Sequence, residues 1–243
     1  MYEIKHRVSY SEVNRKRIAD MARIAHYFQD CTLFHSEDVG MGFQNLEQNK
    51  RAWFLSGWQI EADRFPSFGE YVTIRTWPYG FKGMYGYRNF DILDENEKSI
   101  VQANSIWIFM NLSKGRPMKP EEEDVKPYIM SSALLMEYAP RKIELPGTEE
   151  GFEMEQQDII KVLGSHIDSN MHVNNAKYIE LAMTYLTEDF DVWQLRVDYR
   201  KAAVEGDCMM PATYRQEEKI ITAFLDENEK PYVIVSFSGR KMA

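Results

Sequence analysis

The sequence predicts an α+β protein with two similar halves, each built from one amphipathic helix and an antiparallel sheet. The six-residue segment Leu93 to Lys98 returns unchanged at Leu225 to Lys230, and both copies lie between strand-like runs, as hairpin tips do. Near the start of each half, apolar residues recur at helical spacing. Because several strands follow a single helix in each half, instead of alternating with helices, the sheets should be antiparallel.

The two predicted helices open at similar dipeptides, Val13-Asn14 and Val173-Asn174. The apolar positions of the first helix are Ile18, Met21, Ala22, Ala25 and Phe28. Those of the second helix are Ile179, Ala182, Met183 and Leu186. Because each stripe covers only one side of its helix, we expect each helix to lie on a sheet.

The predicted strands are rich in Trp, Tyr, Ile and Val, which suit a pleated, half-buried surface. In the first half they run from Arg51 to Glu61, Tyr71 to Trp77, Tyr85 to Leu93 and Ser99 to Leu112. In the second half they include Lys219 to Leu225 and Pro231 to Phe237. A glycine followed by an acidic residue precedes a strand in both halves, at Gly69-Glu70 and Gly206-Asp207. This match supports an internal repeat.

A segment rich in proline and charge, Lys114 to Glu150, lies between the two halves. It is typical of a connection between domains. We therefore predict an N-terminal domain over residues 1–130, a linker over residues 131–150 and a C-terminal domain over residues 151–243.

Composition argues against several classes of function. The net charge of −9 disfavours nucleic-acid binding, which needs a basic surface. The only cysteines, Cys31 and Cys208, lie far apart without metal-finger spacing, so neither a disulfide framework nor a zinc finger is expected. No run approaches the ~18 apolar residues of a membrane span, and the first residues lack the apolar core of a signal peptide. We expect a cytoplasmic protein with no membrane insertion.

The segment from Gly164 to Asn175 carries the candidate chemistry. Four polar residues recur there at every second position, namely His166, Asp168, Asn170 and His172. In an extended segment such residues share one face. A helix is expected to begin directly afterwards, at Asn174 or Asn175, and its free N–H groups and positive dipole end can polarise a carbonyl.

Other interpretations of the same residues stay open at this point. His172 can serve as a helix cap or as a buried hydrogen-bonding group, and both Asn174 and Asn175 are good N-cap residues. His166, Asp168 and His172 are also residue types that bind zinc.

The wider pattern resembles a known family. The signature Asp168-x-Asn170-x-His172-Val173-Asn174-Asn175-x-Lys177-Tyr178-Ile179 is similar to the active-site signature of acyl-ACP thioesterases. Further similar segments are Trp58-x-Ile60, Ile74-x-Thr76-Trp77, Trp107-x-x-Met110-Asn111 and Asp198-Tyr199-Arg200-Lys201. The resemblance implies two tandem hotdog folds, in which a long curved antiparallel sheet wraps around one helix. It also implies hydrolysis of the thioester of a fatty acyl chain on acyl carrier protein, which ends chain elongation, without cofactor or metal.

Such hydrolysis suggests a role for each residue of the signature. His172 can act as general base because an imidazole titrates near neutral pH. Asn170 can orient the attacking water, and Asp168 can fix the tautomer of the base. Backbone N–H groups at the start of the helix can receive the oxyanion.

The first half offers no matching base. When the two predicted helices are aligned, Glu12 takes the place of His172 and Tyr10 that of Asn170. We therefore expect the first half to bind the acyl chain. Bulky residues that could line an acyl tunnel, or simply form the core, are Met21, Phe28, Phe34, Trp53, Trp58 and Trp107.

The chain departs from the family at one position. Related enzymes usually carry a glutamate after the Tyr-Arg-Lys segment, whereas this chain has Ala202-Ala203. We expect Asp168 to suffice as the acidic partner. The alternatives are that Glu205 reaches in from the same loop, or that the activity is weakened. Two other functions remain open, namely hydrolysis of acyl-CoA or another thioester at the same site, and acyl binding without catalysis in a regulatory protein. The sequence leaves open the acyl chain length, the carrier, and whether the chain forms a homodimer.

Overall fold

The computed structural model describes residues 1–147 and 150–240. Residues 148–149, in the predicted linker, and residues 241–243, at the end of the predicted C-terminal domain, lie outside the described residues. The chain divides into two compact units. Unit 1 comprises Met1–Ser56 and Ile60–Ala139, and unit 2 comprises Gly57–Gln59 and Pro140–Ala243.

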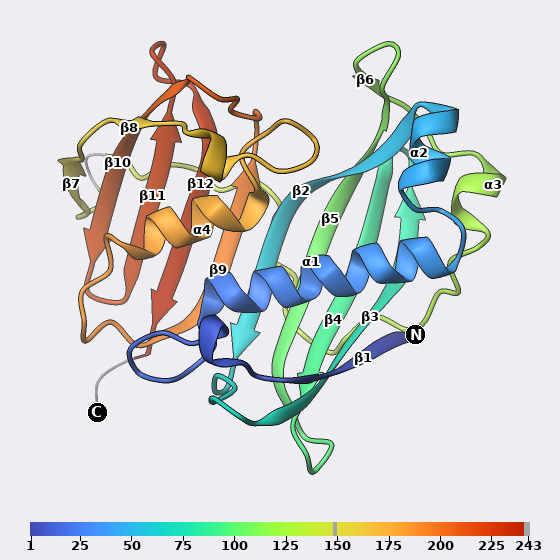
Figure 1. The fold of residues 1–243 in the computed structure, drawn as a ribbon. Coiled ribbons are helices and arrows are strands. Elements are labelled where there is room, and N and C mark those ends of the chain that lie inside the picture. Colours follow the sequence, from blue (N-terminus) through green and yellow to red (C-terminus); the bar gives the residue numbers. More distant parts are fainter. Residues whose placement is uncertain (148–149, 241–243) are drawn as a thin grey trace. The chain divides into compact units, whose positions relative to one another are not determined.

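Unit 1 is an antiparallel sheet crossed by one long helix, α1 (Figure 1). Its strands lie in the order β1-β3-β4-β5-β2. The strands are β1 (Tyr2–Arg7), β2 (Arg51–Ala62), β3 (Tyr71–Lys82), β4 (Tyr85–Leu93), β5 (Ser99–Asn111) and β6 (Arg116–Pro117). The helices are η1 (Tyr10–Glu12), α1 (Met21–Asp38), α2 (Phe43–Asn49) and α3 (Glu122–Val125).

Unit 2 repeats this plan with a shorter helix, α4, across its sheet (Figure 1). Its strands lie in the order β9-β12-β11-β10-β7, and the paired strands are antiparallel. The strands are β7 (Glu153–Gln156), β8 (Ile160–Lys161), β9 (Val192–Tyr199), β10 (Cys208–Gln216), β11 (Lys219–Leu225) and β12 (Pro231–Gly239). The helices are η2 (Gly164–His166) and α4 (Asn175–Met183). The predicted α+β class, with one helix on an antiparallel sheet in each half, is confirmed.

The repeated hexapeptide forms the same turn in both units. Asp94 accepts hydrogen bonds at Oδ1 from the backbone N–H groups two and four residues later, at 2.9 and 3.0 Å. Asp226 accepts the same two bonds at the same distances. Glu97 and Glu229 each have a φ of 59°. Identical sequence therefore gives identical hairpin tips, because the aspartate side chain holds the loop from within.

Two predicted helix boundaries were wrong. Helix α1 begins at Met21 and is capped by Asp20, whose side chain accepts from the backbone N–H of Arg23. The preceding residues cannot be helical, because Arg17 has a φ of 60°, in the left-handed region. Ile18 therefore precedes the helix, and its extended backbone bridges to Ser67.

Helix α4 ends at Met183, so Leu186 lies beyond its end. Strands β3 and β12 are also longer than predicted: β3 continues beyond Trp77 to Lys82, and β12 continues beyond Phe237 to Gly239.

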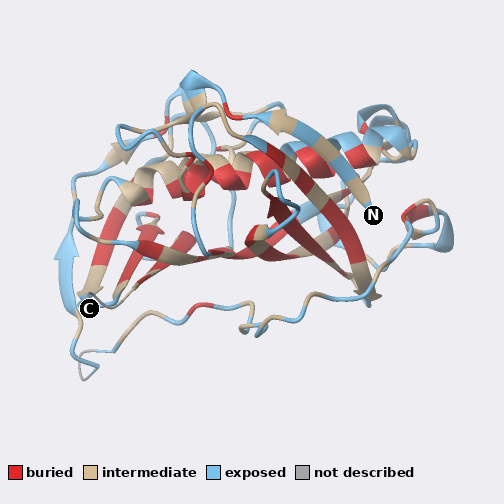
Figure 2. Ribbon diagram, turned by 90° about the horizontal axis from the view of Figure 1, so that it is seen from below, coloured by how far each residue is buried: buried red, intermediate tan, exposed pale blue. Residues whose placement is uncertain are grey.

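The buried residues gather where each helix faces its sheet (Figure 2). In unit 1, Met21, Ile24 and Phe28 of α1 are completely buried. Burying such side chains contributes ~1.5 to 3 kcal/mol each. In unit 2, Ile143 packs against Ile221 and Ile234 of the sheet in an apolar cluster. Part of the predicted linker is therefore packed on the sheet instead of being free in solvent.

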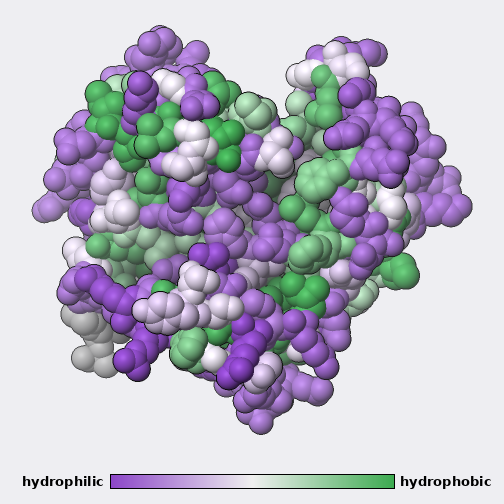
Figure 3. Space-filling model, in the orientation of Figure 1, coloured by the Kyte–Doolittle hydropathy of each residue, from purple (hydrophilic) through white to green (hydrophobic). Residues whose placement is uncertain are grey.

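In the part of the chain that the structure describes, no helix combines the length and apolar character required to cross a membrane. The surface over the helices is a mixture of hydrophilic residues and smaller apolar patches (Figure 3).

Candidate active site

The candidate residues lie on a short hairpin that leads into α4. The backbone N–H of Asp168 donates to the carbonyl of His172 at 2.8 Å, and that of Met171 donates to the carbonyl of Asp168 at 3.0 Å. The side chain of Asp168 accepts from the backbone N–H of Asn170 at 2.8 Å. Met171 has a φ of 62°. The hairpin thus brings Asp168 and His172 to paired positions, and Asn170 lies at its exposed tip.

The prediction that four alternating residues share one face of an extended segment was wrong. Only Ile167 and Val173 form a β-bridge, and residues between them turn back on themselves. His166 belongs to η2, and its Nδ1 lies 3.3 Å from the backbone nitrogen of Leu163, which donates to it. Asp168 and His172 are still neighbours, because residues in paired positions of an antiparallel pair point to the same side.

Unit 1 contains the same hairpin with different side chains. In chain order, Asn14, Lys16 and Ile18 take the places of Asp168, Asn170 and His172. The backbone N–H of Asn14 donates to the carbonyl of Ile18 at 3.0 Å, and that of Arg17 donates to the carbonyl of Asn14 at 2.8 Å. The side chain of Asn14 accepts from the backbone N–H of Lys16 at 2.9 Å. The hairpin is therefore a repeated feature of the fold, whereas its base and its carboxylate occur only in unit 2.

This correspondence corrects the predicted alignment of the halves. The counterpart of His172 is Ile18 and not Glu12, and the counterpart of Asn170 is Lys16 and not Tyr10. Glu12 instead ends η1, as His166 ends η2. The error followed from placing the start of the first helix too early.

The hairpin is attached to the loop after β9. The backbone N–H of Val173 donates to the carbonyl of Ala203 at 2.9 Å, and the backbone N–H of Ala203 donates to the hydroxyl of Tyr178 on α4 at 3.2 Å. The hydroxyl of Tyr199 donates to the carbonyl of Asn175 at 2.9 Å. Burial raises the pKa of both tyrosines, so they stay neutral. These bonds fix the hairpin relative to the start of α4.

At the start of α4, one backbone N–H group, that of Asn175, is not used in a hydrogen bond among the described residues. The side chain of Asn174 caps the helix by accepting from the backbone N–H of Ala176 at 2.9 Å, and the carbonyl of Asn174 accepts from that of Lys177 at 3.0 Å. The N–H of Asn175 has no hydrogen-bond partner among the described residues. Of the first amides of the helix, it is the one that stays available to an incoming oxyanion.

Glu205, the alternative to the glutamate missing at Ala202, lies three residues further along the chain. Ala203 is fully buried, and Glu205 is exposed and lies against η2. A Cβ added to Gly164 would lie 3.2 Å from the Oε1 of Glu205. The carboxylate of Glu205 is thus beside the segment that precedes the hairpin. Between Asp168 and His172, in contrast, no side-chain hydrogen bond is formed in the described structure.

Zinc binding through His166, Asp168 and His172 finds no support. Within residues 1–147 and 150–240, no group of three or more His, Cys, Asp or Glu side chains is arranged to hold a metal ion.

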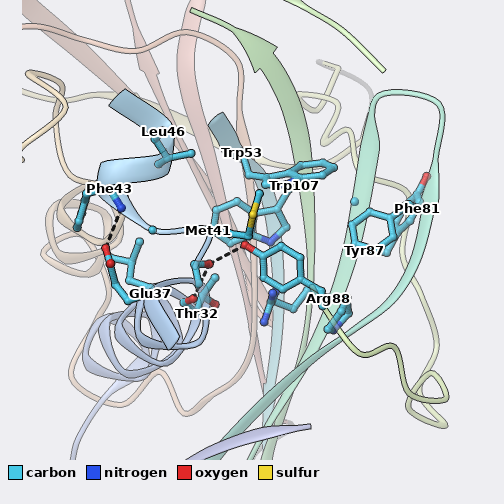
Figure 4. A pocket seen from close by; sticks show the side chains of 16 residues that line it. Thr32, Glu37, Met41, Phe43, Leu46, Trp53, Phe81, Tyr87, Arg88 and Trp107 are labelled. Carbon is cyan, nitrogen blue, oxygen red and sulfur yellow. Dashed lines mark hydrogen bonds between the residues drawn. The ribbon is translucent and has the colours of Figure 1, made fainter. Parts of the chain in front are cut away.

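Unit 1 holds a pocket between α1, α2 and the sheet, with an empty volume of about 670 Å³ including its open mouth (Figure 4). Its apolar lining includes Leu33, Met41, Leu46, Trp53, Phe81 and Trp107. Its charged lining residues are Glu37 and Arg88.

Only two of the proposed tunnel residues, Trp53 and Trp107, line this pocket. Met21, Phe28 and Trp58 are buried in the core, and Phe34 is exposed. The sequence analysis missed both α2, which forms one wall, and Arg88. The signal for Arg88 was present, since it is a charged residue inside the predicted strand Tyr85 to Leu93.

Comparison with known proteins identifies the family. A model of the acyl-ACP thioesterase N-terminal domain matches residues 1–128, and a model of the C-terminal domain matches residues 149–238. The chain belongs to the acyl-ACP thioesterase family.

Named relatives of this thioesterase-family chain include plant enzymes. It is 29% identical over 206 residues to a chloroplastic acyl-[acyl-carrier-protein] hydrolase of Cuphea viscosissima, covering 78% of this chain and 49% of that protein. It is 28% identical over 206 residues, with the same coverage, to a chloroplastic palmitoyl-acyl carrier protein thioesterase of Cuphea hookeriana. The chain thus spans about half the length of these curated relatives.

Solved structures of similar fold confirm the double hotdog. An acyl-ACP thioesterase from Bacteroides thetaiotaomicron superposes with a TM-score of 0.88 at 20% identity, covering 98% of this chain and 97% of that one. The 12:0-ACP thioesterase from Umbellularia californica superposes with a TM-score of 0.84 at 16% identity, covering 98% and 96%. The predicted pair of tandem hotdog folds is therefore correct.

Proposed function

We propose that the protein hydrolyses the thioester of a fatty acyl chain on acyl carrier protein, using His172 as general base. The family supports the reaction class, since curated relatives are named as acyl-ACP hydrolases and thioesterases. The observation that carries the assignment to unit 2 is the duplicated hairpin. Both units build the same turn, but only in unit 2 does it carry Asp168, Asn170 and His172.

In the proposed mechanism His172 takes a proton from water, and the resulting hydroxide attacks the thioester carbon. General-base help of this kind typically contributes ~10² to 10⁴ in rate. Asn170, at the tip of the hairpin, orients the water. Asp168, paired with His172 across the hairpin, favours the charged imidazole that forms. The imidazolium then protonates the departing thiolate, which returns the base to its starting state.

The oxyanion that develops is assigned to the N–H of Asn175. This group lies at the positive end of the α4 dipole and lacks a partner among the described residues, and one well-placed donor is worth ~3 to 4 kcal/mol. Stabilisation of the oxyanion in this way requires no metal ion.

The acyl chain is assigned to the pocket of unit 1. The aromatic and aliphatic lining of Trp53, Trp107 and Met41 suits a hydrocarbon. Unit 1 would then bind the chain and unit 2 would cleave the thioester, in line with domains over residues 1–130 and 151–243 joined by residues 131–150.

The acidic carrier protein needs a local basic surface on this acidic chain. The sequence offers two groups of basic residues, Arg15 to Arg17 and Arg196 with Arg200 and Lys201. In the second group, Arg196 donates to the carbonyl of Pro140. Arg200 is bound to Asp198 and Lys201 to Asp226. These three side chains are therefore already bound to groups of the protein itself.

The decisive experiment measures hydrolysis of acyl carrier thioesters of several chain lengths by the wild type and by His172→Ala. We expect at least a hundred-fold loss in kcat for the variant. The matched control is His166→Ala, which removes a neighbouring imidazole that accepts a bond from Leu163 and should keep most of the rate. Undiminished hydrolysis by His172→Ala would refute the assignment of the base.

The same assay separates the alternatives. If acyl-CoA is cleaved as fast as acyl carrier protein substrates, the enzyme is a general thioesterase. Tight binding of acyl chains without turnover would identify a regulatory acyl-binding protein instead.

A further inference from the structure

The pocket of unit 1 contains a buried positive charge. Arg88 is 7% exposed and reaches the pocket from β4 (Figure 4). No carboxylate lies within ion-pair distance of its guanidinium among the described residues. An arginine is rarely buried this far without a carboxylate, because removing the charge from water costs several kcal/mol.

Only one of the three guanidinium nitrogens of Arg88, Nη1, has hydrogen-bond partners among the described residues. Nη1 of Arg88 lies 3.0 Å from Nδ1 of His35 and donates to Oγ1 of Thr76 at 3.1 Å. Both partners are uncharged, since burial lowers the pKa of His35 to about 4. Nε and Nη2 make no hydrogen bond to the described residues. The ring of Tyr128 lies 5.5 Å from the guanidinium carbon, which offsets part of the cost of burial.

Three hydroxyl groups around the pocket already donate to partners within the protein. The hydroxyl of Tyr128 donates to Ser36, that of Ser36 to the carbonyl of Thr32, and that of Thr32 to the carbonyl of Phe28. A ligand in the pocket therefore meets hydrocarbon, aromatic rings with the hydroxyl of Tyr87 and the indole N–H of Trp53, and one charged group with free donors, Arg88.

The one carboxylate of the pocket lining is held elsewhere. Oε1 of Glu37 accepts from the backbone N–H of Phe43 at 2.8 Å, at the start of α2 (Figure 4). Glu37 is exposed and forms no ion pair with Arg88.

We propose that this pocket binds an alkyl carboxylate, with the carboxylate oxygens on Nε and Nη2 of Arg88 and the hydrocarbon chain along the walls of Trp53 and Trp107. A guanidinium binds a carboxylate through two parallel charge-assisted hydrogen bonds, which are about twice as strong as neutral ones. A plain hydrocarbon end would leave the same donors unpaired. This inference deepens the proposed function, since it rests on the pocket being the acyl site.

Two sources supply this chemistry. One is a free fatty acid, the product of thioester hydrolysis. The other is an acyl thioester with a second carboxylate at the far end of its chain.

The first test is a binding titration that needs no turnover. The purified chain is titrated with dodecanoate and with dodecanol at pH 8, followed by tryptophan fluorescence and calorimetry. We expect dodecanoate to bind at least about ten-fold more tightly than dodecanol. Arg88→Met should abolish the preference, and Arg88→Lys should retain part of it, since lysine keeps the charge without the two-pronged geometry.

Two control variants accompany this titration. Arg116→Met removes an exposed arginine of β6 and should bind like the wild type. Glu37→Gln removes the carboxylate at the mouth and should keep the preference for dodecanoate. Equal affinities of the wild type for the two ligands, or a preference that survives in Arg88→Met, would overturn the proposal. If Arg88→Met does not fold, the wild-type comparison and Arg88→Lys decide.

The second test identifies the source. Wild type and Arg88→Met are compared in the hydrolysis of carrier-bound dodecanoyl and ω-carboxydodecanoyl thioesters. A higher kcat/KM for the ω-carboxy substrate that is lost in Arg88→Met identifies the dicarboxylic acyl chain. Competitive inhibition of dodecanoyl hydrolysis by dodecanoate, lost in Arg88→Met, identifies the product.

Absence of both effects in an active enzyme would overturn the link between Arg88 and the acyl site. A chain that binds dodecanoate through Arg88 but cleaves no thioester would contradict the proposed function alone.

Discussion

The backbone N–H of Asp168 donates to the carbonyl of His172 at 2.8 Å, across a turn that has a copy in the other half of the chain. In that copy Asn14 and Ile18 form the same bond at 3.0 Å. The turn therefore keeps its geometry with an Asp or an Asn at its first position and with different residues at its tip and its last position. This separation of scaffold from chemistry allows substitutions that alter one and leave the other intact.

Replacing Asp168 by asparagine should keep the fold and reduce the rate. Asn14 shows that an amide holds this turn by accepting from the residue two positions later, whereas an amide cannot stabilise a charged imidazole as a carboxylate does. We expect hydrolysis to fall at least ten-fold with little change in Tm, as measured by steady-state kinetics and thermal unfolding. Asp168→Ala, the control, should lower both the rate of hydrolysis and Tm. A fully active Asp168→Asn would show that the carboxylate has no chemical role.

Replacing Asn174 by alanine should destabilise the protein by ~1 kcal/mol, the usual cost of losing an N-cap side chain. Its side chain accepts from the backbone N–H of Ala176 at the start of α4. Urea unfolding measures the difference. Asn175→Ala serves as control, because the side chain of Asn175 makes no such capping bond, and it should stay within ~0.5 kcal/mol of wild type. Equal effects of the two changes would contradict this cap.

Replacing Gly86 by alanine should disturb the pocket wall. A Cβ added there would lie 2.9 Å from Cζ3 of Trp53, so the indole must move. Overpacking of this kind costs ~1 to 3 kcal/mol, and it should change both the unfolding free energy and the fluorescence of Trp53. At Gly80 on β3 the nearest atom to an added Cβ is 3.9 Å away. Gly80→Ala should therefore have the smaller effect, and the reverse order would disprove the contact.

The buried His35 should make stability fall as the pH is lowered from 6.5 to 4. Burial, together with the nearby charge of Arg88, lowers its pKa from 6.5 to about 4. Over this window the unfolded chain binds a proton that the folded chain does not, so acid favours unfolding. Below pH 4 both states are protonated, and the effect levels off.

The size of this effect is about 3 kcal/mol across the window. It is measured as the difference in unfolding free energy between the wild type and His35→Gln, which cancels the contributions of other groups. The variant should lose less stability on acidification. Parallel pH profiles for the two proteins would show that His35 is not buried in its neutral form.

Local patterns were sufficient for much of the fold. The repeated hexapeptide predicted both hairpin tips, because an aspartate side chain organises such a turn without help from distant residues. The strands Tyr85–Leu93 and Lys219–Leu225 were predicted to the residue. The start of the second helix was predicted at Asn174 or Asn175, and Asn174 is the cap. Each of these features depends on residues close together in the chain.

Other features were decided only by tertiary structure. The start of α1 was misplaced because a left-handed Arg17 and the bridge from Ile18 to Ser67 interrupt an otherwise helical pattern. The pairing of Asp168 with His172 depends on a reversal that an alternating pattern does not reveal. The environment of Arg88 is made by β3, α1 and the segment around Tyr128. Sequence by itself determined which residues could do chemistry, whereas contacts between distant segments decided which of them are buried, paired and open to a ligand.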